Sequence, residues 1–214
     1  MVQIDWYAWH RLYDRPKSKR AARLSQMQDL ILRALDEQQG TPVNVLSVCA
    51  GQARELLGAV ERFSRPQDVH AHLIELDPRN MEYAERALRD AGIGGVRTTV
   101  GDAGLRSHYE GIAPLDVLLL CGVFGNLTPQ DIERTIALAR AIVRPGGIVI
   151  WTRHRNEPDC VPQIESWFAS HGFTGIHSGD RADPVAIAAH RLTGDGVPLP
   201  AEERVFTFIV GVAA

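Results

Sequence analysis

Val43-Asn-Val-Leu-Ser-Val-Cys-Ala-Gly-Gln-Ala-Arg54 is an apolar run that leads into a turn of small residues and then into a helical pattern. The run predicts a β-strand over residues 43–48, followed by a helix over about residues 53–63. Small side chains at Cys49, Ala50 and Gly51 let a ligand approach the backbone closely. The first turn of the following helix offers N–H groups that have no partner within the helix. These features together predict a site for a nucleotide-type ligand.

Glu75 closes the next apolar run, His72–Leu76, which predicts a second strand. An acidic residue at the tip of this strand can accept hydrogen bonds from both hydroxyls of a ribose. The 24 residues from Gly51 to Glu75 fit one strand-helix-strand unit, close to the spacing of about 20 that is typical of dinucleotide sites. The acid therefore belongs to the same predicted site as the turn.

Helices and strands alternate along the rest of the chain. Helical spacing predicts helices over 18–37, 78–91, 128–143 and 162–171, the first three with N-caps at Ser18, Asp77 and Thr128. Apolar runs predict strands over 96–100, 115–120, 148–152, 173–177 and 204–212. The Gly- and Pro-rich segment 178–203 is expected to be a loop. The pattern predicts an α/β fold, a three-layer Rossmann-like sandwich around a seven-stranded, mostly parallel sheet. We expect the last strand to be antiparallel and at the edge. An N-terminal helical cap or lid over residues 1–40 would precede one globular unit, 41–214.

Composition narrows the possible partners. The 214 residues carry a net charge of −3, so no overall positive field favours nucleic acid or anionic lipid. Three widely spaced cysteines, at 49, 121 and 160, cannot all pair within one chain and indicate a reducing, cytoplasmic setting. No apolar window is long enough for a membrane span, and no cluster indicates a metal site. The sequence leaves the oligomeric state open.

Several motifs in this order resemble those of the class I S-adenosylmethionine-dependent methyltransferases. The family's glycine-rich first loop matches Cys49, Gly51 and Ala53, with Ser47 in place of its usual acid and only the central glycine retained. Cysteine and alanine are small enough for close approach if φ stays negative. Glu75-Leu-Asp-Pro78, Gly101-Asp102-Ala103 and Arg144-Pro-Gly-Gly147 are similar to later motifs of the family.

The resemblance implies S-adenosyl-L-methionine as cofactor and S-adenosyl-L-homocysteine as product. Glu75 would bind the ribose and Asp102 the adenine amino group. The cofactor-binding set that it implies is Cys49, Ala50, Gly51, Glu75, Leu76, Asp102, Ala103, Cys121 and Gly122.

The methyl acceptor is expected to be a small molecule, methylated on oxygen or nitrogen by in-line transfer. The segment after the fourth strand, Cys121-Gly-Val-Phe124, lacks the Asn/Asp-Pro-Pro-aromatic motif of enzymes that methylate amino groups of bases or amides. His154 and His10 are the candidate catalytic bases for a hydroxyl acceptor. The candidate substrate pocket consists of Trp9, Tyr13, Phe124, Asn126 and Arg153.

Two alternatives share parts of this pattern. An NAD(P)-dependent oxidoreductase would have the same strand-turn-helix and ribose acid, but it should show three glycines in the first turn, where this chain has one. The second alternative is a non-catalytic protein with a degenerate methyltransferase fold, which binds S-adenosylmethionine or acts through protein contacts. Such a protein would tolerate the departures from the family's first-loop motif at Ser47, Cys49 and Ala53.

Overall fold

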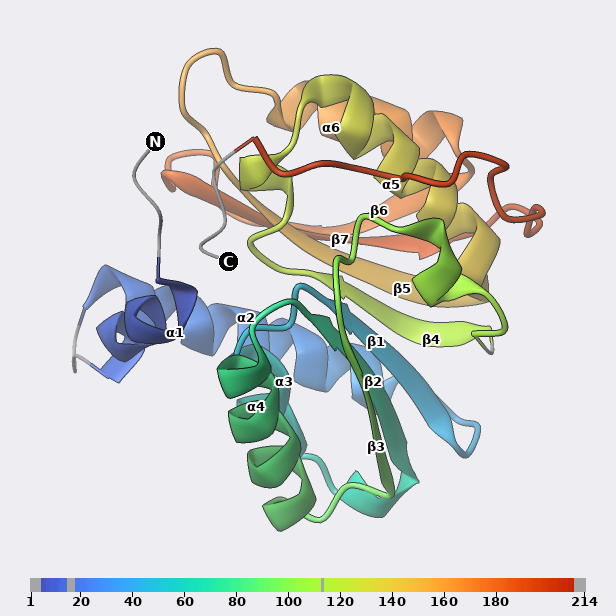
Figure 1. Cartoon of the computed structure of the whole chain (residues 1–214). Coiled ribbons are helices and arrows are strands. Elements are labelled where there is room, and N and C mark those ends of the chain that lie inside the picture. The colour runs from blue at the N-terminus through green and yellow to red at the C-terminus, as the bar shows by residue number, and fades with distance from the viewer. Residues whose placement is uncertain (1–4, 15–17, 113, 210–214) are drawn as a thin grey trace. The chain divides into compact units, whose positions relative to one another are not determined.

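The structure is a computed structural model that describes residues 5–14, 18–112 and 114–209 (Figure 1). Contacts between Cα atoms divide the chain into two compact units. Unit 1 comprises Met1–Asp102 with Val210–Ala214, and unit 2 comprises Ala103–Ile209.

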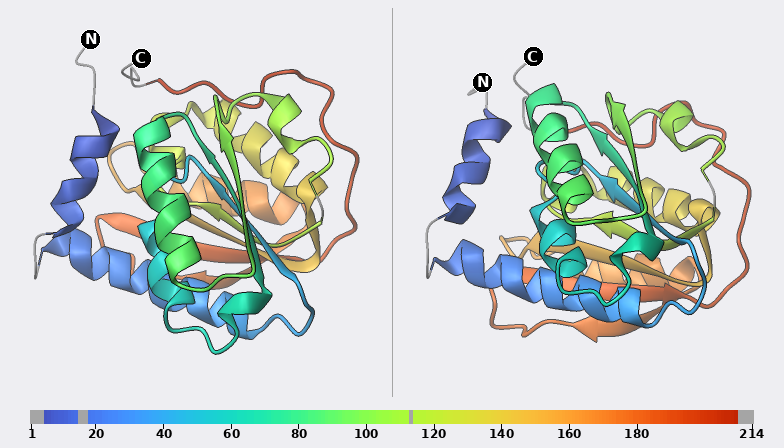
Figure 2. Two further views of the ribbon diagram at one scale, coloured as in Figure 1. Left: turned by 60° about the horizontal axis from the view of Figure 1, so that its bottom comes forward. Right: turned by 90° about the horizontal axis from the view of Figure 1, so that it is seen from below.

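Unit 1 contains a parallel sheet in the order β3-β2-β1, with β1 at Val43–Val48, β2 at Val69–Glu75 and β3 at Gly95–Val100. Its helical elements are α1 (Trp6–Trp9), η1 (His10–Asp14), α2 (Lys19–Asp36), α3 (Arg54–Val60), η2 (Pro66–Asp68) and α4 (Pro78–Asp90). Helix α2 packs along α3, which also contacts α4, and α4 covers β2 and β3 (Figure 2). The connections from β1 through α3 to β2 and from β2 through α4 to β3 place the carboxyl ends of all three strands at one edge.

Predicted caps begin two helices of unit 1. Ser18 accepts a hydrogen bond from the Ala21 N–H at the start of α2, and Asp77 accepts one from the Arg79 N–H at the start of α4. Such caps satisfy N–H groups that have no partner within the helix. Because β2 ends at Glu75 and Asp77 caps α4 two residues later, the cap fixes the chain direction immediately after Glu75.

Unit 2 contains a sheet in the order β4-β5-β7-β6. Its strands are β4 (Leu115–Leu120), β5 (Val143–His154), β6 (Phe173–Ser178) and β7 (Val185–Leu192). Helices α5 (Pro129–Ile142) and α6 (Val161–Ser170) pack on β5 and β6 respectively and against each other, while η3 (Arg106–Tyr109) and η4 (Phe124–Asn126) are short turns (Figure 1). Strand β4 is buried at every position, as its continuous apolar run requires.

Strand β5 begins earlier than the predicted strand over residues 148–152. Val143 pairs with Leu115 but the next pair is Val117 with Ile148, so the Arg144-Pro-Gly-Gly147 stretch forms an irregularity within one long strand. A Cβ added at Gly147 would lie 2.7 Å from the Leu115 carbonyl oxygen. Only glycine fits this approach of the two strands, so the motif has a structural role.

The predicted last strand is wrong. The antiparallel strand is β7, at Val185–Leu192, which lies between β5 and β6 and not at the sheet edge. It falls within the segment that was expected to be a loop, because Ala186, Ala188 and Ala189 are poor β-formers outside their buried context. Residues 204–209 have the β-like pattern but form only one bridge, between Arg204 and Leu105, and residues 210–212 of the predicted strand lie outside the described residues.

The predicted fold class is confirmed. Strands and helices alternate along most of both units, and the described residues form seven strands. All strand pairs are parallel except those of β7, which pairs antiparallel with both β5 and β6. This is a Rossmann-like α/β fold with an N-terminal helical segment. In the part of the chain that the structure describes, no helix is both long and apolar enough to cross a membrane.

Candidate functional site

The loop after β1 has a left-handed backbone at every second residue. Cys49, Gly51 and Ala53 have φ values of 52°, 53° and 48°. The expectation of negative φ is therefore wrong for Cys49 and Ala53. A left-handed conformation of a residue with a Cβ costs roughly 1–2 kcal/mol, and such strain is typical of binding sites. The loop keeps the geometry of a glycine-rich turn although two of the three residues are not glycine.

Glu75 links the tip of β2 to this loop. Its Oε2 accepts a hydrogen bond from the Gly51 N–H at 2.8 Å, and its Oε1 accepts one from the Asp77 N–H at 2.9 Å. Burial raises the pKa of Glu75, and these N–H donors counteract part of that effect. A carboxylate has about four acceptor positions, so each oxygen can still accept a hydrogen bond from a ligand. The structure thus brings the predicted turn and the predicted ribose acid into direct contact.

Asp102 and Leu76 lie at the same edge of the unit 1 sheet. The Gly101 N–H donates to the Glu75 carbonyl oxygen at 2.9 Å, which brings the start of the Asp102 segment beside the end of β2. Burial and the charges of Glu75 and Asp102 raise the pKa of the Cys49 thiol, which therefore stays protonated between these two carboxylates. Leu76 leaves 44% of its surface exposed at this acidic edge. Exposed apolar surface beside carboxylates suits a flat heterocycle that carries hydroxyl and amino donors.

His10 lies against the same loop. A Cβ added at Gly51 would be 2.4 Å from His10 Nε2, so only glycine leaves room for the imidazole. Burial and then the charge of Arg54 lower the pKa of His10 to about 4, which makes the ring neutral at pH 7. Its Nδ1 is buried and has no hydrogen-bond partner among the described residues.

Two arginines bind the N-terminal segment, which we define as residues 5–14, to the edge that carries Glu75. Arg54, in the first turn of α3, forms an ion pair with Asp14 at 2.5 Å. Arg79, in the first turn of α4, bridges Asp5 at 2.9 Å and Asp77 at 2.6 Å. No local sequence pattern marks these residues, because the partners lie up to 74 positions apart.

Aromatic side chains fill the N-terminal segment. Trp9 and Tyr13 pack edge to face at 5.4 Å, and Tyr13 stacks on His10 at 5.9 Å. The Arg20 guanidinium lies 4.9 Å from the Trp9 ring centre, and that of Arg79 lies 5.0 Å from the ring centre of Tyr7. The predicted pocket residues Trp9 and Tyr13 therefore form one cluster with the predicted base His10.

A second group of predicted residues surrounds the loop after β4 in unit 2. The Gly122 N–H donates to Thr152 Oγ1 at 2.8 Å, and the Asn126 amide donates to the Gly122 carbonyl oxygen at 2.9 Å. Gly122 has a φ of 79°, and Cys121 before it is half-buried. Thr152 on β5 thus holds the loop, a role that its position in an apolar strand does not reveal.

The remaining predicted residues of unit 2 differ in environment. Phe124 is fully buried and packs on Trp151 at 5.6 Å, so this loop exposes backbone in place of the phenyl ring. Arg153 donates to the Phe124 carbonyl oxygen. His154 is exposed and, as the next residue of β5, points to the opposite face from Arg153. Ala103 is buried, and its carbonyl oxygen accepts from the Tyr109 hydroxyl at 2.6 Å.

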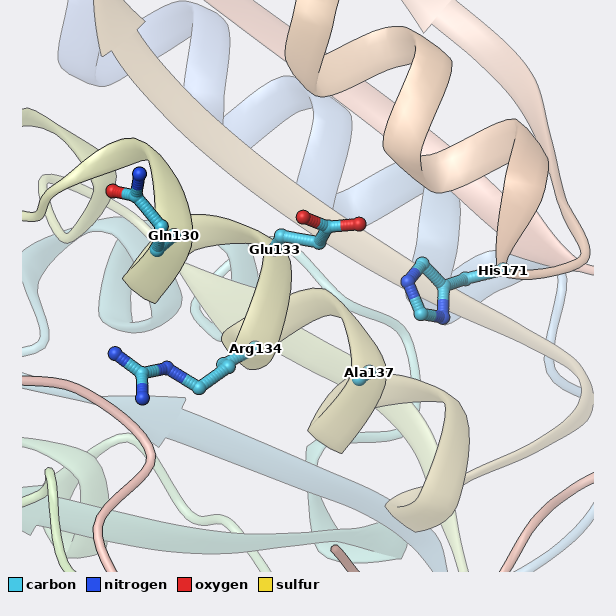
Figure 3. A pocket seen from close by; sticks show the side chains of 5 residues that line it. All are labelled: Gln130, Glu133, Arg134, Ala137 and His171. Atoms are coloured by element: carbon cyan, nitrogen blue, oxygen red, sulfur yellow. The ribbon is translucent and has the colours of Figure 1, made fainter. Parts of the chain in front are cut away.

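A surface hollow of unit 2 lies apart from these residues. Figure 3 shows side chains from α5 and the end of α6 around it, namely Gln130, Glu133, Arg134, Ala137 and His171. Arg134 pairs with Asp131 of the same helix. None of the predicted site residues lines this hollow.

Comparisons with known proteins agree with this geometry. The profile of a protein family described as "Putative methyltransferase" matches residues 17–172. No curated protein is similar enough in sequence to match. Because the family match over residues 17–172 covers most of the chain, the chain belongs to this methyltransferase family. It has the fold of the S-adenosylmethionine-dependent enzymes.

Solved structures share the fold at low identity. The CurJ carbon methyltransferase is 14% identical with a TM-score of 0.69, over 89% of this chain and 59% of its own. The magnesium protoporphyrin IX methyltransferase from Synechocystis, solved with S-adenosylhomocysteine, is 9% identical with a TM-score of 0.63, over 86% and 92%. The ribosomal protein L11 methylase from Lactobacillus delbrueckii is 15% identical with a TM-score of 0.57, over 80% and 79%. The chain spans less than two thirds of the carbon methyltransferase, and the acceptors named differ widely.

Proposed function

We propose that this protein transfers a methyl group from S-adenosylmethionine to an oxygen or nitrogen atom of a small molecule. The observation that carries the proposal is the contact of Glu75 with the Gly51 N–H at 2.8 Å, at the carboxyl edge of β1 and β2. Ligands of open α/β sheets bind at this edge. The three free cysteines suit the cytoplasm as the setting.

The residues of unit 1 fit the adenosyl part of the cofactor. Glu75 has acceptor positions left for two ribose hydroxyls, and Leu76 offers an exposed apolar face to the adenine. Asp102 would accept from the adenine amino group. The backbone of Cys49 and Ala50 would contact the cofactor at the strained turn, beside the His10 ring that packs against Gly51. In unit 2 we assign Ala103, Cys121 and Gly122 to the cofactor on the resemblance to the family.

Bound S-adenosylmethionine supplies an electrophilic methyl group on a positively charged sulfur. Displacement at such a carbon depends mainly on alignment and on exclusion of water. For a hydroxyl acceptor, His10 or His154 would take the proton. His10 is neutral at pH 7, since its pKa is lowered to about 4, and its buried Nδ1 can accept a hydrogen bond.

The N-terminal helical region, residues 1–40, would act as a cap over the first loop, with residues 41–214 as the methyltransferase unit. The ion pairs of Arg54 with Asp14 and of Arg79 with Asp5 hold its first described part there. Trp9 and Tyr13 would then face the acceptor. In unit 2 we assign Asn126, on the loop after β4, and Arg153, on β5, to the acceptor, whereas the Phe124 ring is fully buried. His10 is the residue through which this cap touches the loop.

Calorimetry with S-adenosylhomocysteine tests the proposal through Glu75. Glu75→Ala removes an acceptor of charge-assisted hydrogen bonds, and we expect binding to weaken by about 1–3 kcal/mol. Glu85→Ala is the matched control, because Glu85 pairs with Arg89 on the exposed part of α4. An unchanged dissociation constant in Glu75→Ala would remove Glu75 from the site.

Ligand choice separates the alternatives. Tight binding of NAD alone would support the oxidoreductase, and binding of S-adenosylmethionine without turnover of any acceptor would support a non-catalytic protein. A screen of hydroxyl and amine acceptors, scored by release of S-adenosylhomocysteine, tests the small-molecule part of the proposal. Methylation of protein but of no small molecule would contradict that part.

A further inference from the structure

Arg153 lies near the carboxyl end of β5, and Arg155 is the first residue after this strand. Residues two apart on a strand share a face, and the Arg155 N–H continues the ladder to β7 by donating to the Pro184 carbonyl oxygen at 2.9 Å. His154, between them, points to the other face. The β7 residues paired with this end are Ala186, opposite Arg153, and Val185, opposite His154, so the partner strand supplies no counter-charge.

Each of the two guanidinium groups donates its hydrogen bond through Nη1, and in each the Nε side has no recorded partner among the described residues. Arg153 donates from Nη1 to the Phe124 carbonyl oxygen, and Arg155 donates from Nη1 to Asp159 at 3.1 Å. In both, Nε is buried and has no hydrogen-bond partner in the described parts of the chain. An N–H group in this state carries most of the free-energy cost of desolvation without a compensating bond.

The number of carboxylate partners also indicates that Arg153 and Arg155 could bind an anion. Arg153 is half-buried and forms no ion pair with any carboxylate in residues 5–14, 18–112 or 114–209. Arg155 keeps 13% of its side-chain exposure and has Asp159 as its carboxylate. Only one of the two guanidinium groups therefore has a carboxylate partner among the described residues, so the pair carries an excess positive charge. The edge formed by Nε and Nη2 is planar and can hold two oxygens of one carboxylate or phosphate.

From these observations we propose that Arg153 and Arg155 form a binding site for an oxyanion, a carboxylate or phosphate, carried by the methyl acceptor. The assignment to the acceptor rests on the proposed function. It rests also on the bond from Arg153 to Phe124, which places the site beside the loop that follows β4. The site narrows the substrate class to small acids or phosphate esters whose methylated atom is a separate hydroxyl or amine.

Nitrogen-15 NMR of the arginine side chains tests the site directly. Inorganic phosphate and acetate are titrated at constant ionic strength, with acetamide as the neutral isostere of acetate. We expect saturable shifts of the Nε–H signals of Arg153 and Arg155 with the anions and none with acetamide. The Nε–H of Arg140 already donates to the Asp195 carbonyl oxygen, so its signal is the internal control.

Variants make the result specific. Arg155→Gln should weaken anion binding about tenfold, as expected for loss of a charge-assisted bond, and Arg140→Gln should leave it unchanged. Arg153→Lys keeps the charge but loses the planar edge, and should also weaken binding. The absence of saturable shifts in the wild-type protein would overturn the site, as would equal binding in Arg155→Gln. Which anion binds more tightly distinguishes a carboxylate from a phosphate acceptor.

S-adenosylhomocysteine binding, measured on the same samples, separates this inference from the proposed function. Binding of S-adenosylhomocysteine without any phosphate or acetate shift contradicts the anion site and leaves the proposed methyl transfer standing. Anion shifts without S-adenosylhomocysteine binding have the opposite meaning. In that case the oxyanion site stands and its assignment to a methyl acceptor fails.

Discussion

His10 and His190 are two histidines whose pKa values are lowered alike, although one lies in the half-buried N-terminal segment and the other in a buried core. Burial lowers the pKa of each to about 4, in the N-terminal segment and in the core of unit 2 respectively. His190 accepts a hydrogen bond from Trp151 Nε1 at 3.1 Å and stacks on Phe168 at 4.3 Å. His10 has charged neighbours and a buried Nδ1 without a partner in the described chain.

The comparison shows that a shifted pKa alone does not mark a functional histidine. Both rings are neutral at pH 7 for the same physical reason, since burial penalises the charged form. They differ in whether their hydrogen-bonding groups are satisfied within the protein. A satisfied ring contributes to stability, whereas an unsatisfied group beside a ligand loop remains available to a ligand or a proton.

His190→Ala should produce the largest effect on stability. The change leaves a cavity beside Phe168 and removes the acceptor of the buried Trp151 N–H, which we expect to cost about 3 kcal/mol. His10→Ala should cost less than about 1 kcal/mol, because His10 is only half-buried and accepts no hydrogen bond from a described residue that the change would leave unpaired. Urea unfolding of both variants provides the measurement.

For ligand binding we expect the opposite order, with the larger effect from the His10 variant. We expect His10→Ala to weaken S-adenosylhomocysteine binding about tenfold, as for loss of one strong contact, and His190→Gln to leave it unchanged. Equal stability losses in the two alanine variants, or unaltered binding in His10→Ala, would contradict the division between a structural and a site histidine.

The contribution of His190 should be clearest in how the unfolding free energy changes with pH. The unfolded chain takes up a proton on His190 below pH 6.5, whereas the folded protein does so only below about pH 4. Stability is therefore lost as the pH falls from 6.5 to 4, by up to about 3 kcal/mol from this residue. His190→Gln keeps an acceptor for Trp151 but does not titrate, so its unfolding free energy should fall less over this range. Parallel curves for the two proteins would show that His190 does not contribute.

The smallest effect is expected in the strained loop. Ala53→Gly relieves a left-handed conformation worth roughly 1–2 kcal/mol, and this offsets the lost methyl burial and the added chain entropy. Its unfolding free energy should change by only a few tenths of a kcal/mol. Ala50→Gly lacks the relief and should destabilise by about 1.5 kcal/mol. If Ala53→Gly and Ala50→Gly lose similar amounts of unfolding free energy in thermal or urea unfolding, the left-handed backbone at Ala53 carries no strain.

Predictions from sequence succeeded where one residue or one local run is sufficient. Strands β1 and β4 were predicted at their observed bounds, and the caps at Ser18, Asp77 and Thr128 accept the expected hydrogen bonds. The order of the elements predicted that Glu75 and Gly51 lie at the same edge of the sheet, and the structure shows them in contact. The cofactor, catalytic and pocket roles of the named residues stay predictions.

Predictions failed where distant parts of the chain decide the outcome. Residues 185–192 form a strand because β5 and β6 flank them, although alanines dominate the segment. Residues 204–209 have alternating apolar side chains yet make hydrogen bonds to Gly104 and Asn126 in place of a strand ladder. Neither environment can be read from a local window.

The sequence by itself determined the α/β class, the family resemblance and the turn from Cys49 to Ala53, because periodicity, caps and small residues act over a few positions. The tertiary structure alone decided that Cys49 and Ala53 adopt left-handed backbones and that Arg54 and Arg79 hold the N-terminal segment. It also decided that Arg153 and Arg155 each keep a buried Nε without a hydrogen-bond partner among the described residues. These features depend on contacts between residues far apart in the chain, and burial then determines which hydrogen bonds and charges are satisfied.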